Sequence, residues 1–525
     1  MIAIKGGLVI DGSGAGAYEA TVVVEGDRIT DVTREEVAGA ETFDAAGCIV
    51  SPGFIDCHAH SDAYLVLEPS APSKISQGIT TEINGQCGGS IAPRYGEARL
   101  SSDWASLLGE RLTWHSLAEY REALEAAGPG VNTVQFTGHN TLRSSVVGYA
   151  GRPATEDEMR EMERMLAQTM DEGARGLTTG LIYQPGKYST PREVERLAKV
   201  AAERGGLYAT HMRSEGDEIL EAIDETARLA RATGIRAEIS HLKTAGRRNW
   251  GKIDAVLEKI EAGMAEGVFL GSDRYPYCAA GTDLDVVLPD WAQEGAAKAE
   301  CERLSDAALR ERITREIDES GRDWTTVAIG GTWHPCNKKY SGRTVAEILE
   351  SGDGGAAGAR GAGALVCEIL EKDSCRTGAF FSGMCEENLG KILSKKWILP
   401  GSDASLRSPE GPLGEDWPHP RAYGTMPEFY RRLRALGATR EEAVRRMTGE
   451  PAKRFGLPGR GLIAKGAFAD IAIWREDGFK ALATYADPHR FAAGVELVMV
   501  NGVAEYERGR FTGRRGGRFL DRFLI

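Results

Sequence analysis

The chain has 525 residues, a net charge of −13 and a hydrophobic content of 42%. This length exceeds one ordinary compact core, so we expect several domains, or a barrel with additions. The acidic balance argues against nucleic acid as a partner, because phosphate contacts need clustered lysine and arginine. No apolar run approaches the ~18 residues of a membrane span, and the first residues lack the pattern of a secretory signal. The nine scattered cysteines, an odd number, favour a reduced cytoplasmic protein over a disulfide scaffold.

Both ends of the chain are predicted to form β-strands. A turn at 25–27 separates two apolar runs near the N-terminus, which is typical of a hairpin. The predicted strands are 20–24, 28–32, 470–474 and 495–503. We therefore expect one small β-sandwich domain assembled from residues 1–52 and 455–525.

The middle of the chain alternates between strand and helix patterns. Thr155 and Glu158 form a capping box at the start of a helix over 155–170, which carries an apolar stripe. Further helices are predicted from Thr190, over 215–233 and over 254–266. Eight strands are predicted at 53–58, 80–83, 131–136, 176–179, 207–211, 235–241, 268–273 and 398–403. This alternation indicates an α/β fold with parallel strands, and eight of them predict a (β/α)8 TIM-like barrel over residues 53–454.

Residues 283–395 interrupt the alternation. They contain no βα unit and include a glycine- and alanine-rich run at 354–364. We interpret the segment as an insertion between the last two barrel strands. The run itself fits a lid or rim subdomain and a flexible surface excursion equally well.

His58 and His60 follow an apolar strand in the sequence Gly-Phe-Ile-Asp-Cys-His-Ala-His. Alternate residues of a strand point to the same face, so both imidazoles can reach one point. His211 and His241 also fall at predicted strand ends, so four of the nine histidines lie there. Functional side chains of a (β/α)8 barrel gather at the carboxyl ends of its strands. These histidines therefore indicate a metal centre.

Two further residues complete the set of candidate metal ligands. Cys87 lies in a glycine-rich segment beyond the second strand, and Asp403 ends the last one. Imidazole, thiolate and carboxylate suit Zn2+, whereas a thiolate disfavours magnesium or calcium. A carboxylate in that position can also take a proton from the attacking water and pass it to a leaving nitrogen. Taken alone, Cys87 is better explained as a small buried hydrophobic residue, and Asp403 equally well as a turn or helix-cap aspartate.

Five or six ligands exceed the three that one catalytic zinc takes from a protein, so two neighbouring zinc sites are expected. We assign Cys87, His211 and His241 to a tightly bound zinc. His58 and His60 would hold a second, more weakly bound zinc, with the cysteine bridging the two ions and the aspartate close by.

These motifs resemble the amidohydrolase superfamily over nearly the whole chain: the His-x-His after Ser-Pro-Gly-Phe-Ile-Asp, the later strand-end histidines and the final Gly-Ser-Asp. Most members with two metals bridge them with a carboxylated lysine after strand four. This chain has no lysine there and offers Cys87 instead. That variant is similar to the N-acyl-D-amino-acid deacylases (D-aminoacylases). Further segments that resemble this family are 180–183, 210–213, 240–243, 275–277 and 418–421.

The resemblance implies roles for four more residues. Lys243, Tyr275 and Arg421 match residues that hold the α-carboxylate of the substrate, a task that suits charge-assisted hydrogen bonds. Tyr183 matches a tyrosine that polarises the scissile carbonyl and would stabilise the developing oxyanion by about 3 kcal/mol. Taken alone, the charged residues are better explained as solvated surface groups, and Tyr183 can be explained as a packed aromatic.

Several features stay open at this stage. His139, after the third strand, fits a ligand, a substrate contact or a structural histidine, and His419 fits a residue that positions Arg421. Arg274 fits a contact to an acidic substrate side chain and an outward-pointing side chain. The segment 404–417 departs from the simplest family pattern and is expected to lie over the active-site mouth.

The resemblance implies a zinc-dependent enzyme that hydrolyses N-acyl-D-amino acids to a carboxylate and a free D-amino acid. Its implied partner is this small-molecule substrate, while neither nucleic acid nor a membrane is expected and the oligomeric state is open. One alternative is a cyclic amidase of the dihydroorotase or hydantoinase type, against which the missing lysine counts. The other is a non-catalytic scaffold with the same fold, against which the full ligand set counts.

Overall fold

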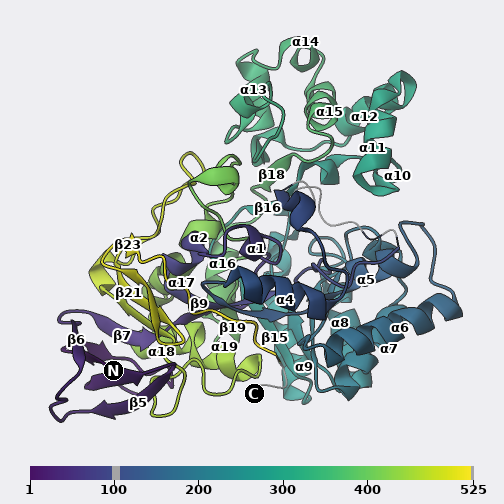
Figure 1. Ribbon diagram of the computed structural model, residues 1–525. Coiled ribbons are helices and arrows are strands. Elements are labelled where there is room, and N and C mark those ends of the chain that lie inside the picture. The colour runs from purple at the N-terminus through teal and green to yellow at the C-terminus, as the bar shows by residue number, and fades with distance from the viewer. Residues whose placement is uncertain (97, 99–106, 522–525) are drawn as a thin grey trace.

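Eight parallel strands form the centre of the molecule (Figure 1), as the alternation of strands and helices predicts. The computed structural model describes residues 1–96, 98 and 107–521. The eight strands are β8 (Phe54–Asp56), β9 (Ile79–Asn84), β10 (Asn132–Gln135), β12 (Gly176–Gly180), β13 (Leu207–His211), β14 (Arg236–Ile239), β15 (Leu270–Arg274) and β19 (Ile398–Pro400). One residue separates β10 from β11 (Thr137–Gly138). The three-stranded sheet β10-β9-β8 therefore leads directly into the six-stranded sheet β11-β12-β13-β14-β15-β19.

Hydrogen bonds also link the last of these strands to the first. The Cys57 N–H donates to the Pro400 carbonyl at 3.0 Å, and the Asp403 N–H donates to the His58 carbonyl at 2.8 Å. Because the strands are parallel, their carboxyl ends share one rim. β14 and β19 end two to three residues earlier than predicted, so His241 and Asp403 lie just beyond their strands.

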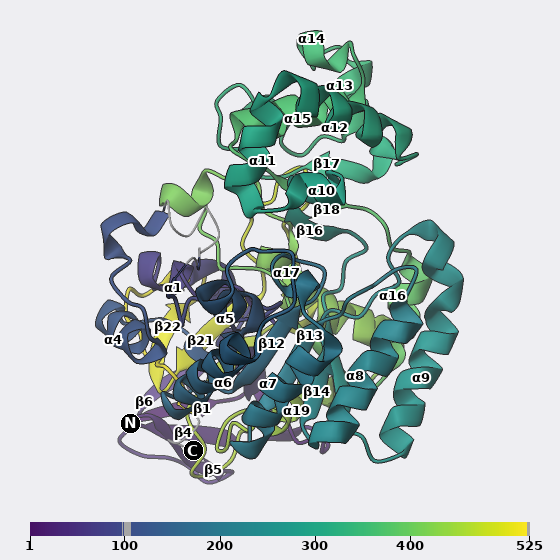
Figure 2. The same ribbon diagram turned by 90° about the vertical axis from the view of Figure 1, so that its right-hand side faces the viewer.

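Helices cover the outside of these strands (Figure 2). In α6 the capping box between Thr155 and Glu158 is present, and the predicted stripe with Met162 and Leu166 is buried. The covering helices are α4 (Leu117–Ala127), α5 (His139–Val146), α6 (Glu156–Asp171), α7 (Pro191–Glu203), α8 (Ile219–Thr233), α9 (Ile253–Ala265), α16 (Glu386–Ser394), α17 (Arg421–Ala435) and α18 (Arg440–Met447).

The helix predicted over 215–233 begins later than expected. α8 starts at Ile219, and Glu215 lies in the preceding loop. The predicted start was wrong because Glu215 makes polar contacts to His211 and His241, and such tertiary contacts override a local preference for helix.

The two ends of the chain meet in one sheet, in the order β23-β22-β21-β20-β7-β2-β3. Its strands are β2 (Leu8–Val9), β3 (Tyr18–Glu19), β7 (Ile49–Pro52), β20 (Ile471–Trp474), β21 (Val495–Val500), β22 (Val503–Glu507) and β23 (Arg510–Phe511). A second sheet, β5-β4-β1-β6, contains β1 (Ile2–Lys5), β4 (Thr21–Glu25), β5 (Arg28–Thr33) and β6 (Glu41–Asp44). The predicted hairpin is β4–β5, which pairs antiparallel. One hydrophobic cluster, with Ile4 and Ile473 among its members, includes residues of both sheets.

The segment between β15 and β19 folds around a hydrophobic cluster of its own, which includes Ile313, Ile317 and Leu365. Figure 2 shows it above the barrel strands. Its elements are the antiparallel strands β16 (Ala280–Asp283), β17 (Val327–Ile329) and β18 (Gly378–Phe381), and the helices α10 (Asp290–Gln293), α11 (Ala296–Ser305), α12 (Ala307–Glu319), α13 (Val345–Glu350), α14 (Gly355–Gly358) and α15 (Ala362–Lys372). The glycine- and alanine-rich run is therefore largely helical, which favours a folded subdomain. The exact domain boundaries stay a prediction.

Short helices complete the chain: α1 (Tyr64–Leu67), α2 (Pro72–Ile75) and α19 (Gly449–Arg454). Among the helices of residues 1–96, 98 and 107–521, none is both long and apolar enough to cross a membrane. All nine cysteines fall in this part of the chain and are free thiols.

Candidate active site

Cys87 lies at the centre of the predicted metal centre. Its Sγ is 3.3 Å from His58 Nε2 and 3.2 Å from His241 Nε2. These three residues follow β9, β8 and β14, which are far apart in sequence and share one rim of the barrel. The distances satisfy the geometric condition for the thiolate and the imidazoles to hold one ion.

Asp403 approaches the same point from the last strand. Its Oδ1 is 3.1 Å from His60 Nε2 and 3.3 Å from His58 Nε2. Ligand atoms of His58, Cys87, His241 and Asp403 all lie within 4.8 Å of one another. Every side chain predicted for the second zinc site is therefore close to the others.

His211 completes the set predicted from the sequence. Its ring packs against His241 with centroids 4.5 Å apart, and its Nε2 lies 3.4 Å from Glu215 Oε2. Its Nδ1 has no hydrogen-bond partner although the residue is buried. A buried polar atom without a partner is costly unless something binds it. The set of donors (one sulfur, imidazole nitrogens and carboxylate oxygens) suits zinc. The side chains therefore fit the predicted metal.

The backbone is strained at three of these positions. Cys87, His241 and Asp403 have φ values of 52°, 38° and 51°. A residue other than glycine in this left-handed region costs about 1–3 kcal/mol, and such strain concentrates at functional sites where the surrounding structure enforces it. Here it turns three donor side chains toward one point beyond the strand ends.

Two carboxylates behind the histidines were missed in the sequence analysis. Asp273 Oδ2 is 3.1 Å from His58 Nδ1, and Asp273 Oδ1 accepts the backbone N–H of His241 at 3.0 Å. Glu215 Oε1 is 3.0 Å from His241 Nδ1. Asp273 lies near the end of β15, so the strand-end rule that identified the histidines could have found it. Glu215 gave no such signal, because it fits a helix start equally well.

Neighbouring charged groups shift the pKa values of the thiol and the imidazoles in the site. Burial alone would raise the pKa of the Cys87 thiol, but His58 and His241 hold it well below its usual value. Burial alone would lower the pKa of His60 and His211; contacts with Asp403 or Glu215, together with Cys87, raise both to about 9. A metal ion that binds here must displace protons from these imidazoles, so its binding depends on pH.

The residues predicted to bind the substrate carboxylate surround this centre. Arg421 donates from Nη1 to Asp403 Oδ2 at 2.7 Å, and its Nε has no hydrogen-bond partner. Lys243 Nζ is 2.8 Å from His241 Nδ1 and also pairs with Glu215. The guanidinium of Arg421 lies 4.6 Å from the ring centroid of Tyr275.

Two tyrosines border the site, Tyr275 beside Arg421 and Tyr183 beside His211. The Tyr275 hydroxyl is buried without a hydrogen-bond partner. The Tyr183 ring packs against His211 with centroids 4.8 Å apart, so its phenol lies beside the metal centre. Burial raises the pKa of Tyr183 well above its usual value, and the charge of Cys87 adds to the effect. A phenol that keeps its proton can donate a hydrogen bond.

Three residues left open by the sequence can now be placed. His139 Nε2 pairs with Glu193 at 2.9 Å, in a buried cluster with Arg143, which favours the structural interpretation. His419 Nδ1 accepts the backbone N–H of Arg421 at 3.0 Å, as expected of a positioning residue. Arg274 stacks on the neighbouring Tyr275 with 3.9 Å between the guanidinium carbon and the ring centroid.

A buried ionic cluster fixes the segment that carries Asp403. Lys74 Nζ pairs with Asp56 Oδ2 at 2.8 Å and with Glu82 Oε1 at 2.9 Å. Asp56 also accepts the backbone N–H and the hydroxyl of Ser402 at 2.8 and 2.6 Å. The first and last strands are thus tied together directly below the site.

The segment 404–417 packs against two parts of the molecule. Trp417 Nε1 donates to the Tyr485 carbonyl at 2.9 Å, and Lys338 of the insertion donates to the Glu415 carbonyl at 2.7 Å. Its expected place over the active-site mouth stays a prediction.

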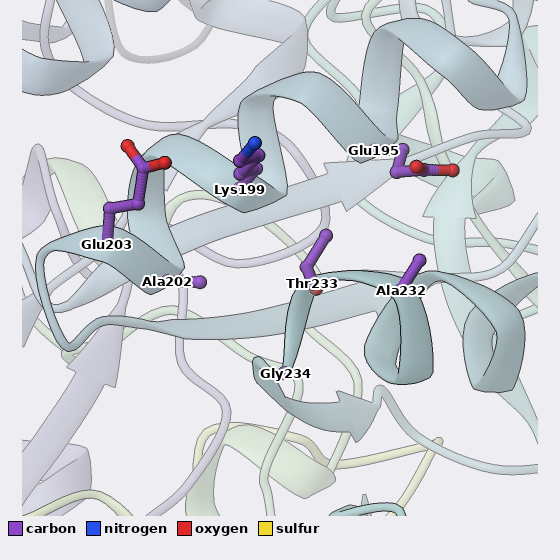
Figure 3. A pocket seen from close by; sticks show the side chains of 7 residues that line it. All are labelled: Glu195, Lys199, Ala202, Glu203, Ala232, Thr233 and Gly234. Atoms are coloured by element: carbon purple, nitrogen blue, oxygen red, sulfur yellow. The ribbon is translucent and has the colours of Figure 1, made fainter.

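A surface hollow of about 360 Å3 lies between the carboxyl ends of α7 and α8 (Figure 3). Its lining includes Lys199, Glu203 and Thr233 and none of the predicted site residues. A helix that leads into a parallel strand ends near the amino end of that strand, so the hollow lies at the opposite rim from His211. It takes no part in the site described above.

Comparison with known proteins agrees with this geometry. The chain belongs to the amidohydrolase family, whose model matches residues 41–329 and 388–506. It is 34% identical to an N-acyl-D-glutamate deacylase of Alcaligenes xylosoxydans xylosoxydans, over 99% of this chain and 96% of that protein. A D-aminoacylase structure with a binuclear metal centre superposes with a TM-score of 0.82 at 34% identity, covering 99% of each chain. An N-acyl-D-glutamate deacylase from Bordetella bronchiseptica, complexed with zinc and a phosphonate inhibitor, has a TM-score of 0.82 at 31% identity and covers 99% of each chain.

Proposed function

We propose that this protein hydrolyses the amide bond of N-acyl-D-amino acids in a zinc-dependent reaction, giving a carboxylate and a free D-amino acid. The observation that carries this proposal is the position of Cys87 Sγ between His58 and His241, at 3.3 and 3.2 Å. The resemblance to the amidohydrolase superfamily implies that this cysteine takes the place of the carboxylated lysine of most members with two metals. The names of the similar proteins, which include D-aminoacylase and N-acyl-D-glutamate deacylase, support the same substrate class.

The metal would be held by two overlapping sets of side chains. Cys87, His211 and His241 would bind one zinc tightly, while His58 and His60, with Cys87 as a bridge, would bind a second more weakly. When bound, zinc supplies a Lewis acid that polarises the amide carbonyl and lowers the pKa of the attacking water. The binuclear centre of the similar D-aminoacylase supports two sites. Metal analysis of the purified protein should give about one to two zinc ions per chain.

The chain's own residues divide the remaining work. Lys243, Tyr275 and Arg421 hold the α-carboxylate of the substrate and so fix the amide near the metal centre. Tyr183 donates a hydrogen bond to the carbonyl oxygen as negative charge develops on it. Asp403 accepts the proton of the attacking water and delivers it to the amine nitrogen as the C–N bond breaks.

The decisive experiment is an assay with the pure D and L enantiomers of N-acetyl amino acids. Hydrolysis is measured as release of the free amine. We expect hydrolysis of one or more D compounds and at least about 100-fold less of their L partners, a difference of roughly 3 kcal/mol in transition-state binding. A chelator should abolish the activity, and added zinc should restore it. Equal rates for both hands, or no loss on chelation, would contradict the proposal.

Two other functions predict different results. A cyclic amidase would open dihydroorotate or hydantoin rings, so these compounds belong in the same assay and should stay intact. A non-catalytic scaffold would bind zinc yet release no amine from any substrate.

We also propose a cytoplasmic location and a small-molecule substrate as the main partner. Nine free thiols support a reducing compartment, because such compartments keep cysteines reduced. Fractionation of cells, with the protein detected by an antibody, tests the location.

A further inference from the structure

Glu215 contacts both the candidate metal ligands and a residue predicted to bind the substrate carboxylate. It lies between β13 and α8, and only 13% of its side chain is exposed. Its Oε1 is 3.0 Å from His241 Nδ1 and also contacts the ammonium of Lys243, while Oε2 is 3.4 Å from His211 Nε2. One carboxylate thus reaches two candidate metal ligands and a candidate substrate-binding lysine.

The geometry identifies which nitrogen of His241 faces the metal. Nε2 lies 3.2 Å from Cys87 Sγ, so Nδ1 points away from the metal centre. An imidazole that binds a metal through Nε2 carries its proton on Nδ1, and that proton needs an acceptor. Two groups lie within reach of Nδ1: the ammonium of Lys243 and the carboxylate of Glu215. An ammonium group has no lone pair to accept a proton, so the acceptor is Glu215.

His58 shows the same arrangement on the other side of Cys87. Its Nε2 faces the sulfur at 3.3 Å, and its Nδ1 is 3.1 Å from Asp273 Oδ2. Each of the two imidazoles that flank the thiol is therefore backed by a carboxylate, buried in Asp273 and half-buried in Glu215. Carboxylates in this position fix the ring orientation and the tautomer of a metal-binding histidine.

We propose that Glu215 is a positioning residue with two tasks. It holds His241 in the tautomer and orientation that bind metal, and it holds the ammonium of Lys243 where the substrate carboxylate is bound. The second task rests on the proposed function, whereas the first does not.

The first task is tested by the zinc affinity of the purified full-length protein, measured by competition with a chelator. Glu215→Ala should lower the affinity about 10- to 100-fold, the usual effect of losing such a partner. Glu215→Gln should lower it less, because the amide oxygen can still accept the Nδ1 proton. Glu225→Gln is the matched control, since Glu225 is similarly buried (16% exposed) and pairs with Arg213, which is not a candidate metal ligand.

A Glu215→Ala protein whose zinc affinity stays within twofold of the parent would overturn the first task. If that variant fails to fold, as judged by circular dichroism, Glu215→Gln decides: it must bind zinc more weakly than Glu225→Gln.

The second task is tested with an N-acetyl-D-amino acid and its primary carboxamide, which lacks the carboxylate. At saturating zinc, Glu215→Gln should reduce the preference for the acid, expressed as the ratio of kcat/KM values, at least about tenfold. Lys243→Met should do the same. The double variant should show no further drop, because Glu215 acts through Lys243.

An unchanged ratio in Glu215→Gln would overturn the second task. A parent protein that hydrolyses neither compound would refute the proposed function, and the chelator experiment would still decide the first task.

Discussion

Arg421 donates a hydrogen bond from Nη1 to Oδ2 of Asp403 at 2.7 Å. Arg421, which is proposed to bind the carboxylate of the substrate, thus also contacts Asp403, which is proposed to transfer the proton. Burial would raise the pKa of Asp403, but Arg421 and His241 outweigh it and leave that pKa well below its usual value. In the proposed mechanism, substrate binding and proton transfer would therefore be coupled through the Arg421 side chain.

Arg421→Gln should impair both steps. We expect KM to rise and kcat to fall, with a combined loss in kcat/KM of at least about 100-fold, or roughly 3 kcal/mol. Steady-state kinetics with the preferred N-acetyl-D-amino acid measures this. Arg431→Gln on the same helix, where the arginine pairs with Glu428 at the surface, is the control and should be unaffected. A rise in KM alone would show that Arg421 does not act on Asp403.

Asp403→Asn should reduce kcat by several powers of ten, because an amide cannot accept the proton of the attacking water. Zinc should stay bound, since Cys87, His211 and His241 remain. Turnover and zinc content of the same preparation test both statements. Nearly unchanged turnover would contradict a role of Asp403 in proton transfer.

Cys87→Ser should remove the metal. A hydroxyl is a much weaker zinc ligand than a thiolate, and two predicted sites share this sulfur. We expect less than half an equivalent of zinc per chain and a parallel loss of activity. Cys336→Ser, at an exposed thiol, serves as the control. Full zinc content in Cys87→Ser would place the metal elsewhere.

Glu505 of β22 should make stability depend on pH. Burial raises its pKa from 4.5 to about 8, although the N–H of Gly516 donates to it at 2.6 Å. Between these values the folded chain keeps a proton that the unfolded chain releases. The free energy of unfolding therefore falls as pH rises through this window, by up to about 1.4 kcal/mol per pH unit.

Glu505→Gln should remove most of this dependence, because an amide does not titrate. Urea unfolding at pH 5 and pH 8 measures it: the parent should lose at least about 2 kcal/mol more than the variant between the two. Glu507→Gln on the same strand should behave like the parent. Equal losses in Glu505→Gln and the parent would mean that Glu505 ionises normally in the folded protein.

The barrel and the candidate metal ligands were predictable from the sequence because they depend on local patterns. The capping box at Thr155 and the apolar strand that precedes His58 are each set by neighbours a few positions away. The strand-end rule then placed the histidines, Cys87 and Asp403 on one rim. The roles of Lys243, Tyr275, Arg421 and Tyr183 came from the family resemblance, because no local sequence pattern indicates them.

The sequence by itself thus determined which residues are metal ligand candidates and on which rim they lie. Tertiary structure alone decided that Glu215 leaves its expected helix to contact His241, that Asp273 backs His58, and that Arg421 pairs with Asp403. These contacts join residues that are 18 to 215 positions apart in the sequence. Their energies depend on burial and on distances across the barrel, which exist only once all eight strands have come together.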